Sequence, residues 1–140
     1  KIAQYTGAKY AVACVSGTSA LQVSIRLAGV QYGDEVIVPA LTFIAPINAV
    51  AYNGACPVFL DVDAYYNLDF EKTIEFIQTC TVFKDGATYN KKTDKHISAI
   101  VPVHMWGNAV WLDELILLNH LLLLPRQKRP SQKMSIPELY

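Results

Sequence analysis

Ser16, Gly17, Thr18 and Ser19 stand between an apolar run at 10–15 and a segment with helical spacing. The first N–H groups of a helix lack intrahelical partners, and the helix dipole favours negative charge beside them. Gly17 permits close backbone approach, and the hydroxyls of Thr18 and Ser19 add donors, a combination suited to a phosphate. A plain Ser or Thr helix cap explains the same residues. This stretch therefore leaves two interpretations open, a phosphate site and an ordinary cap.

A second group of candidate residues follows the apolar run at 35–40. The end of this run delivers residues 40–43, which include Thr42 and Phe43, to the same edge of a sheet as the turn at 16–19. An aromatic ring there can stack on a planar ligand, although Phe43 taken alone also suits a core position. Neither stretch contains a Walker A loop or a G-x-G-x-x-G dinucleotide motif.

Alternating strand and helix signals must position these residues. Continuous apolar runs predict strands that are covered on both faces, and 3.6-residue spacing predicts the helices between them. This alternation predicts a three-layer αβα sandwich with a mainly parallel sheet, in which ligands lie at the carboxyl ends of the strands. The expected strands are 10–15, 35–40, 57–62 and 96–104. The expected helices are 18–29, a second that starts at 42 or 45 and ends at 53, and a last one at 111–118. Between these, Asp69 is expected to cap a helix whose apolar stripe is Phe70, Ile74 and Ile77.

The composition is typical of a folded α/β domain. The chain has 140 residues, of which 52% are hydrophobic and 17% charged, with a formal net charge of +0. The length predicts about one domain, and the neutral charge gives no electrostatic reason to expect nucleic acid or a membrane surface as partner. No apolar run reaches the ~18 residues of a spanning helix, and the first residues lack a signal-peptide pattern.

Three widely spaced cysteines, Cys14, Cys56 and Cys80, form no C-x-x-C pair and have no histidine cluster beside them. This spacing predicts neither a disulfide framework nor a zinc or other metal site. We expect three small buried thiols in a reducing compartment, and therefore a cytoplasmic protein.

Together these stretches carry a resemblance to a known family. The segments GAKYAVACVSGTSAL, GDEVIVPALTFIAPINAV, GACPVFLDVD and ISAIVPVHMWGN occur in this order. They closely resemble the sugar aminotransferases of the DegT/DnrJ/EryC1/StrS family over about residues 1–116. The resemblance implies the aspartate aminotransferase fold (fold type I) and the cofactor pyridoxal 5'-phosphate (PLP).

The resemblance also implies roles for individual residues. Gly17, Thr18 and Ser19 match the turn that holds the cofactor phosphate, which favours the phosphate interpretation of that stretch. Phe43 matches the aromatic position that lies against the pyridine ring.

On the substrate side, Thr42, His104 and Trp106 are the candidates that the resemblance implies. His104 and Trp106 match a loop near the active-site mouth, where His104 serves either the structure or a substrate contact. Asp61 and Asp63 match a turn-forming segment, and we expect no acid–base role for them.

The family reaction moves an amino group, usually from glutamate, onto a keto carbon of a nucleotide-linked sugar. Family members usually work as homodimers. The polar segment at 82–95 and the PVHMWGN segment resemble the branch that acts on legionaminic-type amino-sugar precursors. Two alternatives stay open: another fold-type I PLP enzyme, such as a desulfurase or lyase, and a non-catalytic phosphate-binding or regulatory remnant.

The chain departs from the family pattern towards its end. We find neither the aspartate that pairs with the pyridine nitrogen nor the Schiff-base lysine in their family context. We therefore expect residues 1–118 to be an incomplete N-terminal part of the major domain, and 119–140 to be a disordered or frame-shifted tail. The chain alone is expected to be inactive and poorly soluble. The polar segment at 82–95 should form a surface hairpin, and its lysines are not candidates for the catalytic lysine; they are Lys84, Lys91, Lys92 and Lys95.

Overall fold

A three-stranded parallel sheet forms the centre of the protein. The computed structural model describes residues 1–111 and 113–116. The strands β1 (Glu35–Pro39), β2 (Cys56–Leu60) and β5 (Ile97–Ile100) lie in the order β2-β1-β5, and both pairs are parallel. The predicted α/β class with a mainly parallel sheet is confirmed.

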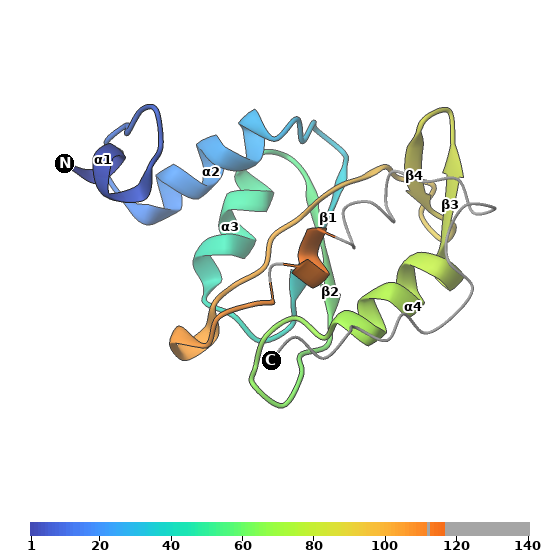
Figure 1. The fold of residues 1–140 in the computed structure, drawn as a ribbon. Coiled ribbons are helices and arrows are strands. Elements are labelled where there is room, and N and C mark those ends of the chain that lie inside the picture. The colour runs from blue at the N-terminus through green and yellow to red at the C-terminus, as the bar shows by residue number, and fades with distance from the viewer. Residues whose placement is uncertain (112, 117–140) are drawn as a thin grey trace.

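Helices cover both faces of this sheet, which gives the three layers that the sequence predicts. Figure 1 shows α2 and α3 together on one side of β1 and α4 on the other. The helices are α1 (Ile2–Thr6), α2 (Gly17–Leu27), α3 (Ile44–Tyr52), α4 (Phe70–Cys80) and the 3-10 turn η1 (Met105–Gly107). Residues 113–116 are also helical and residue 111 is not, whereas residues 112, 117 and 118 of the helix expected at 111–118 and the tail at 119–140 lie outside the described part.

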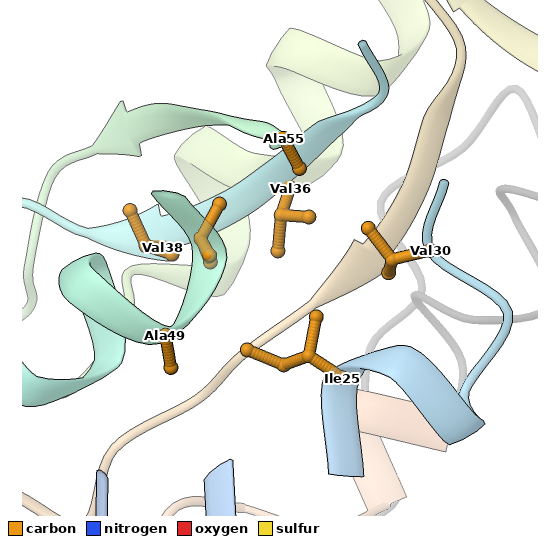
Figure 2. Close-up of a cluster of buried hydrophobic side chains, with 7 residues drawn as sticks. Ile25, Val30, Val36, Val38, Ala49 and Ala55 are labelled. Carbon is orange, nitrogen blue, oxygen red and sulfur yellow. The ribbon is translucent and has the colours of Figure 1, made fainter. Parts of the chain in front are cut away.

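Alternation along β1 divides the core into two clusters. Val36 and Val38 are fully buried beneath α2 and α3, as Figure 2 shows. Ile37 is buried on the opposite face, because successive strand residues point to opposite sides of a sheet. The α2/α3 cluster comprises Ile25, Val30, Val36, Val38, Ala49, Val50 and Ala55.

The second cluster lies beneath α4. Phe70 and Ile77 are buried there and Ile74 packs against them, as the predicted stripe requires. Asp69 caps this helix by accepting a hydrogen bond from the N–H of Lys72 at 3.1 Å. The α4 cluster comprises Ile37, Leu68, Phe70, Ile77, Ile97 and Val110.

The prediction of a strand at 10–15 is wrong for the described structure. These residues form neither a helix nor a strand, and Val12 and Val15 are 86% and 95% exposed. A strand needs a neighbour that satisfies its backbone groups, and β-propensity alone does not supply one. No described strand pairs with this segment, so its apolar residues stay at the surface.

The polar segment forms a hairpin beside the amino end of the sheet. Strands β3 (Thr81–Lys84) and β4 (Ala87–Asn90) pair antiparallel. The turn residues Asp85 and Gly86 both have positive φ, of 51° and 82°. Two such central residues match the twist of a tight hairpin, as the Asp-Gly pair predicts.

Two other expectations need correction. Strand β5 ends at Ile100 instead of continuing to 104, since Pro102 has no N–H to donate. The thiols are not buried: Cys14 and Cys80 are exposed, and Cys56 is partly exposed. Cys14 lies in the segment that forms no strand, and Cys80 ends α4. Among the described residues, no helix is long and apolar enough to cross a membrane.

Candidate functional site

The connections after β1 and β5 diverge to opposite faces of the sheet. The chain leaving β1 enters α3, which packs in the α2/α3 cluster. The chain leaving β5 instead places Val110 in the α4 cluster. Because β1 and β5 are neighbours, this is a topological switch point, and the carboxyl ends of the two strands flank the usual ligand crevice of open α/β sheets.

Thr42 and Phe43 border this crevice on the β1 side. Phe43 is the N-cap residue of α3, makes no side-chain cap bond, and is 66% exposed. The hydroxyl oxygen of Thr42 is buried and has no hydrogen-bond partner in the described chain. An unsatisfied buried hydroxyl costs about 1–3 kcal/mol, so a further hydrogen-bond partner for this atom would be stabilising.

His104 and Trp106 follow β5 on the other side. The N–H of Val110 donates to His104 Nδ1 at 3.0 Å, which leaves the ring proton on Nε2. Trp106 is 73% exposed and has a φ of 55°. A bulky residue in the left-handed region is strained, and such strain clusters at functional sites.

The turn at 16–19 forms the start of α2, where it both caps the helix and offers hydrogen-bond donors. Ser16 Oγ accepts a hydrogen bond from the N–H of Ser19 at 3.2 Å. Within the described chain the N–H groups of Gly17 and Thr18 have no partner, as expected for the first turn of a helix. A side chain added at Gly17 would meet no atom within 4 Å, so the approach to these donors is open.

The structure joins only some of the predicted residues. Residues 40–43 and 101–106 leave neighbouring strands at the same sheet edge. In the described chain no hydrogen bond links the α2 N-terminus to either of these loops. The reason is that residues 10–15 form no strand. The position of the turn at 16–19 is therefore set by the packing of α2 on α3 and not by the sheet. The roles of these site residues stay predictions.

Sequence reasoning missed Asn67, which lies in the turn after β2 and is 3% exposed. Its Oδ1 accepts from the N–H of Met105 at 3.4 Å, and its Nδ2 donates to the carbonyl of Ala109 at 3.2 Å. It therefore bridges to the loop that carries His104. The only signal in the sequence was an Asn beside the helix cap Asp69, which reads as an ordinary turn residue.

Residues 1–121 match the model of the DegT/DnrJ/EryC1/StrS aminotransferase family. The chain belongs to this family. Its sugar aminotransferases are PLP-dependent enzymes, as the resemblance of the four sequence segments implied.

Named relatives of this family member act on nucleotide-linked sugars. The UDP-2-acetamido-2-deoxy-3-oxo-D-glucuronate aminotransferase of Pseudomonas aeruginosa is 47% identical over 116 residues, which cover 82% of this chain and 28% of the relative. The GDP-perosamine synthase of Caulobacter vibrioides is 39% identical over 115 residues, covering 81% of this chain and 27% of the relative. The chain thus spans less than a third of these relatives.

Solved structures of similar proteins share the fold. A DegT DnrJ EryC1 StrS aminotransferase from Brucella abortus matches 85% of this chain and 30% of its own, with a TM-score of 0.71 and 32% identity. The ntda protein of Bacillus subtilis, solved with bound cofactor PMP, matches 86% of this chain and 25% of its own, with a TM-score of 0.66 and 26% identity.

The family's cofactor carries a phosphate, and the first turn of α2 fits one. The partnerless N–H groups of Gly17 and Thr18, the hydroxyls of Ser16 and Ser19, and the open approach are the donor set that an anion needs. The described segments therefore suit the phosphate end of PLP.

The hairpin lysines lie by the opposite edge of the sheet. Lys95 immediately precedes β5 and donates to Cys56 Sγ, at the start of β2, at 3.1 Å. This hydrogen bond raises the pKa of Lys95 and holds its side chain charged at the amino ends of the strands. Lys84 pairs with Asp94 at 2.6 Å. Lys95 and Lys84 are thus both engaged by other side chains.

Asp61 and Asp63 shape the connection after β2. Asp63 Oδ1 accepts from the N–H groups of Tyr65 and Asn67, at 2.8 and 3.0 Å, which fixes a tight turn. Asp61 forms an exposed ion pair with Lys72 at 2.7 Å, and this hydrogen bond raises the pKa of Lys72. Asp63 is therefore engaged within this connection, and Asp61 pairs with α4.

Proposed function

We propose that this chain is part of a PLP-dependent aminotransferase that transfers an amino group from glutamate to a keto carbon of a nucleotide-linked sugar. The observation that carries the proposal is the switch point between β1 and β5, with the buried, partnerless Thr42 hydroxyl beside it. Membership of the family and the nucleotide-sugar names of the relatives support the substrate class.

In this proposal the chain's own residues bind and orient. The first turn of α2, at Gly17, Thr18 and Ser19, binds the cofactor phosphate through its N–H and hydroxyl groups. Phe43 lies against the planar ring, and Thr42 with His104 faces the substrate. When bound, the cofactor supplies an electron sink that stabilises negative charge beside the reacting nitrogen.

The substrate-facing loop gives Trp106 an exposed ring that can stack on a planar group. A legionaminic-type precursor is the finer substrate class that we propose. Homodimer formation and a cytoplasmic location complete the proposal; the free thiol groups of Cys14, Cys56 and Cys80 support a reducing compartment.

Phosphate binding by α2 predicts a charge effect. Gly17→Asp is expected to weaken binding of pyridoxal phosphate by about tenfold or more, because a carboxylate at the helix start repels the phosphate. The helix should persist, since acidic residues are favourable in a first turn. Calorimetric titration with pyridoxal phosphate, and with pyridoxal as the phosphate-free comparison, measures the effect.

Leu27→Asp is the matched control because it adds the same charge at the other, exposed end of the same helix. This variant should bind like the wild type. Equal affinity of Gly17→Asp and wild type would contradict the phosphate assignment.

We further propose that the 140-residue chain by itself does not transaminate. Lys95 is held by Cys56 at the amino ends of the strands, and Lys84 pairs with Asp94. Incubation with pyridoxal phosphate, glutamate and a nucleotide-linked keto sugar should yield no 2-oxoglutarate above the protein-free control. Formation of amino sugar by purified chain would contradict this proposal.

A further inference from the structure

The loop after β5 is fastened to the turn after β2 by two asparagine side chains. Asn67 bonds Met105, the first residue of η1, and Ala109, two residues beyond its end. Asn108 Nδ2 donates to the carbonyl of Tyr65 at 3.0 Å from the opposite direction. Of these two residues Asn67 is buried, whereas Asn108 is exposed.

Asn67 is itself rigidly placed. Its N–H donates to Asp63 Oδ1, and its carbonyl accepts from the N–H of Asp63 at 2.8 Å. The neighbouring Leu68 is fully buried in the α4 cluster. Because both backbone polar groups of Asn67 are hydrogen-bonded and its neighbour lies in the core, Asn67 has little conformational freedom. Its side-chain amide therefore holds its hydrogen-bond partners in place.

The bonds of Asn67 lie next to both residues of the His104–Val110 hydrogen bond. Met105 follows His104 directly, and Ala109 precedes Val110, whose N–H bonds the imidazole Nδ1. Both ends of the His104–Val110 hydrogen bond are therefore adjacent to a residue that Asn67 holds. While Nδ1 accepts this bond, Nε2 carries the proton and, in the described chain, has no partner.

We propose that Asn67 is a positioning residue, which fixes the loop at 104–110 so that His104 offers its Nε2–H as a neutral hydrogen-bond donor to a substrate oxygen. The inference rests on the proposed function, because the oxygen acceptor is a carbonyl, hydroxyl or phosphate oxygen of the nucleotide-linked sugar. His104 serves both of its expected roles in this arrangement, since Nδ1 bonds the loop and Nε2 meets the ligand.

Asn67→Asp tests the bridge with minimal change in shape. The carboxylate still accepts from Met105 but cannot donate to Ala109 and repels its carbonyl. Nitrogen-15 NMR of His104 should show loss of the single Nε2–H tautomer, and the Val110 amide should exchange faster with solvent. Affinity for UDP-N-acetylglucosamine should fall by about tenfold, the size expected for one lost hydrogen bond.

Asn108→Asp is the matched control, because it introduces the same charge in the loop that Asn67 bonds but breaks only an exposed bond. Its His104 spectrum should match the wild type. If Asn67→Asp does not fold, Asn67→Ser removes the amide without adding charge and takes its place. An unchanged His104 spectrum in a folded Asn67 variant overturns the positioning role. Failure of wild type to bind the nucleotide sugar instead counts against the proposed function.

Discussion

Replacement of Ile37 by alanine is expected to lower the free energy of unfolding by about 2–5 kcal/mol, the range for truncating a buried aliphatic side chain. Ile37 is fully buried in the central strand and lies in the α4 cluster with Leu68 and Ile77. Its carbonyl also accepts from the N–H of Val101 at 2.9 Å, beside the start of the loop after β5. Because folded domains are stable by about 5–15 kcal/mol, this change removes a large share of the total.

Urea unfolding followed by circular dichroism measures the loss caused by Ile37→Ala. Leu27→Ala is the matched control, since it also truncates an aliphatic residue but at a position that is 81% exposed. The control should unfold within about 0.5 kcal/mol of the wild type. Similar midpoints for the two variants would show that Ile37 is not at the centre of the core.

Local patterns were sufficient to predict the sheet and its helices where burial and sequence agree. The run at 35–40 became β1, and the Asp69 cap with Phe70 and Ile77 became α4. Both signals depend on residues close in sequence, and their partners lie within the described chain. The Asp85–Gly86 turn is of the same kind, because the two residues set the backbone by themselves.

The expectations that failed depend on partners elsewhere in the structure. Residues 10–15 have the composition of a strand, yet strand formation requires pairing, and no described strand supplies it. The exposure of Cys14 follows from the same cause. Composition alone does not report whether a neighbour is present.

The candidate site was predictable in part for a related reason. The residue types at 17–19 and at Phe43 suggest a site, but taken alone they also suit an ordinary helix cap and a core position, and only the family resemblance favours the site. Asn67 carries no such signal, because its role comes from a side chain that reaches Ala109, 42 positions along the chain. Hydrogen bonds between residues so far apart in the sequence become apparent only when the structure brings the two loops together.

Glu35 shows how the hairpin is held to the sheet through a buried charge. This carboxylate is 3% exposed and accepts from Asn90 Nδ2 at 2.8 Å and from Thr93 Oγ1 at 2.7 Å. Asn90 Oδ1 in turn accepts from the N–H of Lys92 at 3.0 Å. A buried carboxylate is tolerated only while such donors surround it, so the hairpin segment and β1 depend on one another.

Asn90→Asp is expected to lower the free energy of unfolding by about 2–4 kcal/mol at neutral pH, because it removes a donor to a charged group and adds a like charge beside Glu35. Urea unfolding of both proteins at neutral pH measures the difference. Adding Glu35→Gln exchanges the amide and the carboxylate, and should recover most of the loss at neutral pH. A double variant no more stable than Asn90→Asp would mean that the contact between Glu35 and Asn90 contributes little to holding the hairpin on the sheet.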